Sequence, residues 1–398
     1  MIPEFEIRFN LYPHLDEEIA RRGVSCIPHD VCDRYGEVCS SDVVNYWISP
    51  FDFLAHRHPG FKNKILPRDS DESKVVIHLE LPSSPIEIDP RKKHILMVSE
   101  SPLSSNGSHS PRNQCVFDHV LTYLCPPRLA YGKPVSHYFL PFLTVKPFAT
   151  VAHDEAAIEM DLRVRKRRIV YIGANKNYGI KSSFFSRDAS SGGRTLGWLT
   201  NAPTSWTNDP FFRLRYQSRE LLTYRRKFIT RLAQACSDRI SLLVVGSGWS
   251  SYTSWYRRLL LQKPVSLLPP KQLLASGAIV SKYSLLSSSL FCVCIENVRD
   301  CPGYVSEKLF DALHCGCIPI LLPCNGVSEY LPSECFIDIS RFSCEREIVC
   351  YLDALSESEL ISYRKAGARF LESSAYKQRF SFDTFARKLS EVLASVSA

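Results

Sequence analysis

The chain has 398 residues, of which 45% are hydrophobic and 23% are charged, a balance typical of globular proteins. This length is sufficient for two ordinary domains with packed cores, and the composition excludes a largely disordered protein. The net charge of +8 suits an anionic ligand, a phospholipid surface or a nucleic acid, and does not choose among them.

The sequence shows no sign of a membrane-spanning or secreted protein. Apolar runs stay shorter than the roughly 18–20 residues that a membrane helix needs, and the opening MIPEFEIRFN lacks the pattern of a secretion signal. The 15 cysteines are an odd number, and several lie in apolar runs such as LFCVCIEN, as buried thiols do. We therefore expect a cytoplasmic protein with reduced thiols, in peripheral contact with a membrane at most. A lumenal catalytic domain without its anchor is the alternative.

The first half of the chain gives its clearest signals from residue 74 onward. Residues 74–81, KVVIHLEL, predict a β-strand, and residues 94–98 predict a second strand that ends in a polar corner at Glu100. Residues 115–124, CVFDHVLTYL, predict a helix. A strand that runs into a polar loop is typical of a parallel sheet.

A basic run at residues 163–168 indicates a solvated linker rather than a binding patch. We place a domain boundary there, between an N-terminal domain, residues 1–163, and a C-terminal domain, residues 164–398. Residues 177–218 are rich in Ser, Gly, Thr and Asn and predict a loop insertion, which at this length is functional or disordered.

Strands and helices alternate in the second half of the chain. Residues 219–236 carry apolar side chains at helical spacing. Residues 240–248 predict a strand that meets a glycine turn, and residues 317–323 predict a further strand. The strand predicted at residues 290–297 is apolar on both faces, as parallel sheets require. The alternation predicts a doubly wound α/β arrangement.

One helix entrance in this half suggests a binding site. The stretch SEKLFDALHCG predicts a helix that Ser306 caps through its hydroxyl, with Glu307 and Lys308 exposed at its start. The preceding strand ends in Glu296 and Asn297, and ligands of α/β sheets bind beyond such strand ends. The helix N–H groups and the lysine suit a phosphate, and the glutamate suits sugar hydroxyls. The alternative is a surface ion pair, which contributes under about 1 kcal/mol.

Residues 294–322, CIENVRDCPGYVSEKLFDALHCGCIPILL, resemble the donor-binding motif of the family 10 α-1,3/1,4-fucosyltransferases. The family pattern is Phe-Glu-Asn, a variable loop, Tyr-(Val/Ile)-Thr-Glu-Lys, a helix and Gly-x-(Val/Ile)-Pro. Here Ile295 replaces the usual Phe, and the loop VRDCPG is one residue longer than is common. The stretches NGVSEYLP, YRRKFITRL and SESP with FDHVLTYL are also similar to the family. The resemblance covers residues 95–142 and 220–340.

The resemblance implies an α/β fold of two Rossmann-like domains facing a cleft, the GT-B type of glycosyltransferase. Residues 1–163 are then the acceptor-binding domain, and residues 164–398 are the GDP-fucose-binding domain with terminal helices. The resemblance also implies inverting transfer of L-fucose from GDP-fucose to a hydroxyl of an N-acetylglucosamine- or glucose-containing glycan, by an α-1,3 more than an α-1,4 linkage. Glu100 is then the expected base and Glu307 a second catalytic carboxylate near the fucose. An arginine, Arg225 or its neighbour Arg226, reaches the diphosphate. The expected donor-binding residues are Arg225, Glu296, Asn297, Tyr304 and Lys308.

The same resemblance sets the expected cofactors and partners. Basic side chains can take the place of a metal ion at the diphosphate, so we expect no obligatory metal or other cofactor. The expected partners are GDP-fucose and an oligosaccharide or glycoconjugate acceptor, with no nucleic acid. The basic run at residues 163–168 is the candidate for a peripheral membrane contact. The sequence does not indicate an oligomeric state.

Two other functions fit parts of the sequence. Exostosin-like glycosyltransferases, which use UDP-sugars, also carry LFDAL-x-x-GCIP, but they usually have arginines where this chain has Glu307 and Lys308. A non-enzymatic binder of nucleic acid or membrane would use residues 163–168, yet the aromatic residues that single-strand binding needs are missing near this run.

A zinc site is a weaker alternative. Cys26, His29, Cys32 and Cys39 are candidate ligands, but their spacing differs from the tight pairs of structural zinc sites. The HRH stretch at His56–His58 is equally unspecific. Unliganded thiols and surface histidines are the expected state of both groups.

Overall fold

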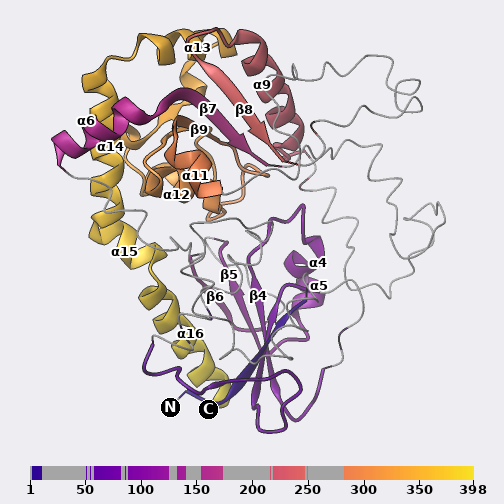
Figure 1. The fold of residues 1–398 in the computed structure, drawn as a ribbon. Coiled ribbons are helices and arrows are strands. Elements are labelled where there is room, and N and C mark those ends of the chain that lie inside the picture. Colours follow the sequence, from indigo (N-terminus) through magenta and orange to yellow (C-terminus); the bar gives the residue numbers. More distant parts are fainter. Residues whose placement is uncertain are drawn as a thin grey trace.

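The structure is a computed structural model, and it describes residues 2–10, 51, 54, 58–81, 86, 88–124, 132–139, 154–173, 216, 218–246, 249 and 282–398. The named strands within these residues form two sheets, one of six and one of five strands, and all of their pairings are parallel. Figure 1 shows the two sheets as separate bodies, with the run of helices α14 to α16 along one side of both. The predicted α/β class is therefore confirmed.

The first sheet is built from the N-terminal part of the chain and has the strand order β2-β1-β3-β4-β5-β6. All residues of β3 and of β5 are buried, as a parallel sheet with both faces covered requires. The predicted strands at residues 74–81 and 94–98 are confirmed as β3 and β4. The strands of this sheet are β1 (Phe5–Phe9), β2 (Ile65–Leu66), β3 (Val75–Leu79), β4 (Lys93–Val98), β5 (His119–Thr122) and β6 (Val135–His137).

The helix predicted at residues 115–124 is wrong. The chain forms β5 there, and this strand lies parallel to β4 with Ile95 opposite His119. A short apolar run fits a buried strand as well as a buried helix, so its periodicity alone cannot decide between them. The backbone hydrogen bonds to β4 and β6 decide for the strand, and they depend on contacts distant in sequence.

The second sheet has the strand order β11-β10-β9-β7-β8. The chain passes from β7 outward to β8 and then returns to place β9 on the other side of β7. The strand order therefore reverses between β7 and β9, and such a switch point is where open α/β sheets bind ligands beyond the carboxyl ends of their strands. The strands are β7 (Lys166–Ile172), β8 (Ser241–Val245), β9 (Ser289–Cys294), β10 (Ile318–Leu321) and β11 (Ile337–Asp338).

Helices cover both faces of this second sheet. Side chains alternate along β7, so that Ile169 and Tyr171 face one apolar cluster with α9 and α13, whereas Val170 faces another with α12 and α15. The predicted helix at residues 219–236 is confirmed as α9. The helices are α4 (Asn106–His109), α5 (Pro111–Gln114), α6 (Glu155–Val164), α9 (Leu222–Ala235), α11 (Lys282–Ser287), α12 (Glu307–His314), α13 (Glu345–Ala354), α14 (Glu357–Glu372), α15 (Ser374–Phe380) and α16 (Phe382–Ser397), with short 3₁₀ helices at Val327–Glu329, Ser333–Cys335 and Ile339–Arg341.

The basic run at residues 163–168 is part of the second sheet and not a solvated linker. It ends α6 and begins β7. The Arg165 guanidinium donates to the carbonyl oxygen of Cys315 at 2.7 Å, and that of Arg167 donates to Leu352 O at 2.7 Å. These two arginines hold together backbone segments that are far apart in sequence, whereas Arg163 and Lys166 of the same run are exposed. The predicted membrane contact through this run stays a prediction.

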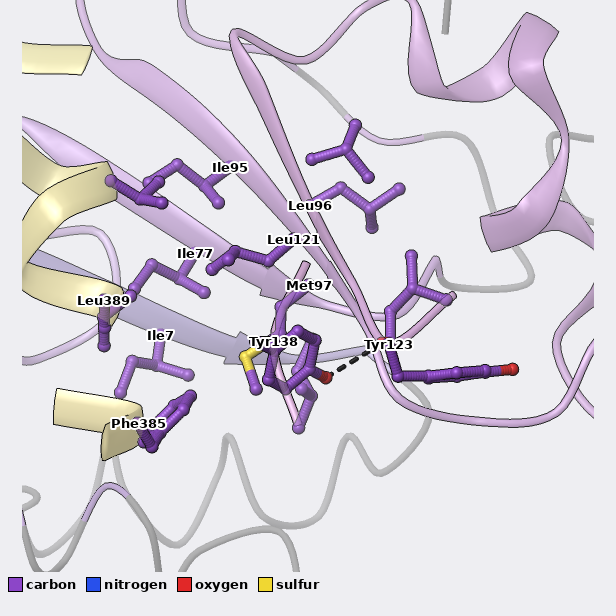
Figure 2. Packing of buried hydrophobic residues seen from close by; sticks show 14 of the residues in the cluster. Ile7, Ile77, Ile95, Leu96, Met97, Leu121, Tyr123, Tyr138, Phe385 and Leu389 are labelled. Atoms are coloured by element: carbon purple, nitrogen blue, oxygen red, sulfur yellow. Dashed lines mark hydrogen bonds between the residues drawn. The ribbon is translucent and has the colours of Figure 1, made fainter. Parts of the chain in front are cut away.

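The last helix, α16, returns to the first sheet. Figure 2 shows Phe385 and Leu389 of α16 against Ile7 and Ile77 of the sheet. In the second half, α6 packs on α14. The predicted boundary at residues 163 and 164 stays a prediction.

Truncation of Leu389 tests whether α16 packs on the first sheet. Leu389 is fully buried in the cluster that joins α16 to the first sheet, so Leu389→Ala leaves a cavity and is expected to lower the free energy of unfolding by about 2–5 kcal/mol. Urea unfolding of the full chain measures this. Met160→Ala is the matched control, because Met160 is 71% exposed and its truncation should leave the unfolding midpoint unchanged. Equal midpoints for both variants would contradict the packing.

Several predictions lie outside the described residues. Cys26, His29, Cys32 and Cys39 are among these, as is nearly all of the insertion at residues 177–218. Within the part of the chain that is described, no cluster of three or more His, Cys, Asp or Glu side chains has the geometry to hold a metal ion. No helix in this same part is long and apolar enough to cross a bilayer. The predicted cellular location stays a prediction.

Candidate functional site

The predicted site residues of the second half meet at the carboxyl edge of β9, next to the switch point. The strand ends at Cys294, and Glu296 and Asn297 follow directly. Helix α12 begins at Glu307, and its N-terminus faces the same edge because Ser306 N donates to Glu296 Oε1 at 2.6 Å. Strand end and helix start are therefore held together by one buried carboxylate.

The cap of α12 differs from the prediction. The Ser306 hydroxyl makes no capping hydrogen bond to the helix, and it accepts instead from Lys308 Nζ at 3.0 Å. Glu296 accepts from the N–H of Ser306 itself, just before the helix begins. Burial raises the pKa of Glu296, and its second oxygen, Oε2, is buried without a hydrogen-bond partner among the described residues.

Glu307 and Lys308 are not an exposed surface pair. Their side chains are 28% and 15% exposed, and Lys308 Nζ lies 3.6 Å from Glu307 Oε1. Burial raises the pKa of Glu307, but the charges of Lys308 and Lys282 outweigh it and leave that pKa below its usual value. Burial lowers the pKa of Lys308, but the charges of Glu307 and Glu296 outweigh this effect and leave that pKa above its usual value. Both groups are charged at neutral pH.

Arg225 brings a second cation to this edge. It lies on α9, is 4% exposed, and donates to Ile295 O at 3.3 Å and to Asn297 Oδ1 at 3.0 Å. Its charge acts on Lys308, and so the two cations lie within electrostatic reach of each other. Of the two arginines that the sequence left open, Arg225 contacts the strand edge, and Arg226 is its half-buried neighbour on the same helix.

Tyr304 links this edge to the first half of the molecule. Its hydroxyl accepts from Asn297 Nδ2 at 3.2 Å, and its ring lies 5.3 Å from that of Tyr123, which follows β5. Burial raises the pKa of Tyr304, and the neighbouring charges of Glu296, Glu100 and Glu307 raise it further. Carboxylates from both halves of the chain therefore act electrostatically on this one tyrosine.

The turn that carries Tyr304 is held by Asn325. This residue adopts a left-handed φ of 59°, accepts from Cys301 N at 2.8 Å and donates to Tyr304 O at 3.0 Å. It is the Asn of the NGVSEYLP stretch, which the sequence marked without giving it a role. Asn325 thus fixes the variable loop between Asn297 and Tyr304.

Glu100 stands at the carboxyl end of β4, in the corner that the sequence predicted. Its carbonyl oxygen accepts from the Tyr123 hydroxyl at 3.0 Å and lies 2.8 Å from His109 Nε2. Its N–H donates to Glu80 Oε1 at 2.6 Å. The backbone of the candidate base is therefore fixed on both sides, and the charge of its carboxylate raises the pKa of Tyr304.

Sequence reasoning missed Glu80 and His109. Glu80 is 1% exposed, has a left-handed φ of 64°, and also accepts from the Ser99 hydroxyl at 3.0 Å. A carboxylate at the end of an apolar strand was the available signal in KVVIHLEL, since a buried acid needs donors. Nothing in the sequence around His109 indicated a contact with Glu100.

Two parallel sheets, with charged side chains gathered at the switch point of the second, define an α/β protein of the ligand-binding, doubly wound class. Residues 276–366 match glycosyltransferase family 10 (fucosyltransferase), C-terminal part. This segment contains β9 and α12, and it confirms the family resemblance for that part of the chain.

Individual proteins are similar over different lengths. The alpha-(1,4)-fucosyltransferase of Arabidopsis thaliana is 30% identical over 117 residues, which are 28% of this chain and 28% of its own length. The chain therefore aligns with little more than a quarter of this relative. A solved alpha1,3-fucosyltransferase has a TM-score of 0.49 at 13% identity and covers 99% of this chain and 91% of its own. HepE of Anabaena in complex with UDP-glucose has a TM-score of 0.45 at 11% identity, with coverages of 81% and 79%. Both solved structures are too distant to indicate a function.

Proposed function

We propose that this protein transfers L-fucose from GDP-fucose, with inversion at the anomeric carbon, to a hydroxyl of a glycan that contains N-acetylglucosamine or glucose. The observation that supports it most is that the family 10 segment contains the β9–α12 edge, where Glu307 and Lys308 lie beside Arg225. In the proposed product, fucose is joined to the acceptor by an α-1,3 linkage. The plant relative is named for an α-1,4 linkage, so the test must resolve the two.

The two cations would bind the donor diphosphate and stabilise it as it leaves. Arginine does this with a planar fork of N–H groups and lysine as a point charge. Lys308 is held at the N-terminus of α12, where the helix dipole also favours an anion. Fixed charges of this kind, in a largely buried site, lower the barrier without having to reorganise during the reaction.

Two carboxylates would act on the sugars. A Glu100 oxygen takes the proton of the acceptor hydroxyl, the acceptor oxygen bonds to the anomeric carbon, and the bond from that carbon to the β-phosphate oxygen breaks as GDP leaves. Glu307 stays ionised because its pKa lies below the usual value, and so it can face the positive charge that develops on the fucose ring. The closeness of both carboxylates to Tyr304 supports this division of roles.

No divalent metal is required in this proposal, because Arg225 and Lys308 supply the positive charge. An Asp-x-Asp pair, Asp69 and Asp71, does occur, but it precedes β3 at the amino end of the first sheet, where Asp69 pairs with Arg8 at 2.9 Å. Turnover is therefore expected to be the same in EDTA as in Mn²⁺ or Mg²⁺, measured as GDP release. A loss in EDTA that Mn²⁺ restores would contradict the metal-free mechanism.

The proposed function is tested by GDP release from GDP-fucose in the presence of lactosamine-type acceptors, followed by NMR of the product to assign the 1,3 or 1,4 linkage and the anomeric configuration. Transfer from GDP-fucose with inversion is the expected result. A matched assay with UDP-sugars tests the exostosin-like alternative. Release from UDP-sugars, with none from GDP-fucose, would overturn the proposal.

A further inference from the structure

Tyr171 is a buried tyrosine whose hydroxyl makes no hydrogen bond within the part of the chain that the structure describes. It lies near the carboxyl end of β7 and is 0% exposed. Its ring packs at 5.7 Å from that of Trp249 in the apolar cluster under α9. The hydroxyl oxygen is buried and finds no hydrogen-bond partner among the described residues. A phenylalanine would fill the same space without this polar atom.

A buried hydroxyl without a partner costs free energy, because it has given up its hydrogen bonds to water. Most buried polar groups of native proteins are paired, and an unpaired one calls for an explanation such as a ligand. The Tyr138 hydroxyl illustrates the ordinary case, since it is buried in the first sheet and donates to Val98 O at 2.9 Å (Figure 2).

The surroundings of the Tyr171 hydroxyl are those of an anion site. The Arg225 guanidinium lies over the Tyr171 ring, 5.6 Å from its centroid. Burial raises the pKa of Tyr171, while the charges of Arg225 and Lys308 act in the opposite direction, so both cations lie within electrostatic reach of the hydroxyl.

Gly173 leaves room for this hydroxyl. A Cβ placed on Gly173 would overlap the Tyr171 oxygen and come within 2.9 Å of Cζ. Any other residue at the end of β7 would push the tyrosine aside. The chain therefore has a tyrosine whose buried hydroxyl costs folding free energy, and a glycine, Gly173, that leaves space for this hydroxyl.

The location agrees with the topology. Tyr171 is the next-to-last residue of β7, Gly173 directly follows this strand, and Glu296 follows β9, so these residues flank the switch point of the second sheet on its two sides. Arg225 bridges them, because its side chain covers the tyrosine ring and donates to Ile295 O.

We propose that the Tyr171 hydroxyl donates a hydrogen bond to a diphosphate oxygen of the donor nucleotide, beside Arg225 and Lys308, and that its ring holds the Arg225 guanidinium in the orientation that binds this diphosphate. The proposal rests on the proposed function only in that the ligand is a nucleoside diphosphate. It does not depend on which base or sugar the nucleotide carries.

Tyr171→Phe tests the role of the hydroxyl in the full chain. The Kd for GDP, measured by titration calorimetry, should rise about tenfold or more, as for the loss of a hydrogen bond to a charged group. The thermal midpoint without ligand should stay the same or rise, because the variant removes an unpaired buried oxygen. The control Tyr138→Phe should do the reverse, with a lower midpoint and an unchanged Kd for GDP.

The outcomes separate this inference from the proposed function. An unchanged Kd in Tyr171→Phe, or weaker binding together with a lower midpoint, overturns the role of the tyrosine even when GDP-fucose is the donor. If the wild type binds UDP instead of GDP and Tyr171→Phe weakens that binding, the fucosyl donor is wrong and the role of Tyr171 stands. Failure of the wild type to bind GDP, UDP, ADP or inorganic pyrophosphate overturns both.

Discussion

Lys308→Ala is expected to lower kcat/KM for GDP-fucose by about 10²- to 10³-fold, as the loss of one preorganised charge at a leaving group typically does. The ammonium group is held between the Ser306 hydroxyl and Glu307 at the start of α12, and its side chain is only 15% exposed. Water or a mobile side chain cannot replace a charge in so enclosed a position. Steady-state GDP release with saturating acceptor gives the measurement.

The control for this variant is Lys388→Ala. Lys388 also pairs with a carboxylate, Glu391, at 2.8 Å, but it lies on α16 and its side chain is 36% exposed. Its removal should leave turnover unchanged, because an exposed ion pair contributes little. Circular dichroism should show both variants folded. If Lys308→Ala turns over nearly as fast as Lys388→Ala, the proposed donor site is wrong.

The donor edge was predictable because its signals are local. An apolar run that ends in Glu296 and Asn297, followed by a helix that starts at Glu307, places these groups together in any α/β sheet. The predicted cap by Ser306 failed because its hydroxyl accepts from Lys308 Nζ and not from an N–H group of the helix, while Glu296, ten residues earlier in the chain, accepts from the N–H of Ser306 itself. Local propensity cannot foresee these contacts, since they depend on how the strand and the helix pack.

Two residues that sequence reasoning missed, Glu80 and Tyr171, act through contacts between different elements of the fold. Glu80 meets the Glu100 corner only because β3 and β4 pair in register, and Tyr171 meets Arg225 only because α9 packs over β7. In the sequence, Tyr171 is one more apolar residue of a buried strand. A buried hydroxyl without a partner becomes visible only when the space around it is known.

Glu100→Gln is expected to lower kcat by about 10²- to 10⁴-fold, the usual contribution of a general base, and to leave the Kd for GDP-fucose unchanged. The amide has the shape of the carboxylate but cannot take the proton of the acceptor hydroxyl. The corner itself should persist, because its hydrogen bonds to Glu80 and Tyr123 use the backbone of residue 100. Single-turnover transfer and calorimetric donor binding separate the two effects.

Glu4→Gln is the matched control, because Glu4 pairs with Lys64 before the first strand of the same sheet and touches no part of the site. It should keep full turnover. The two possible roles of Glu100 predict different results. Loss of a general base lowers kcat and leaves the Kd for GDP-fucose unchanged, whereas loss of a donor-binding carboxylate raises that Kd first. A raised Kd for GDP-fucose in Glu100→Gln, with the rate at saturating donor preserved, would place Glu100 in the donor site and leave the reaction without its base.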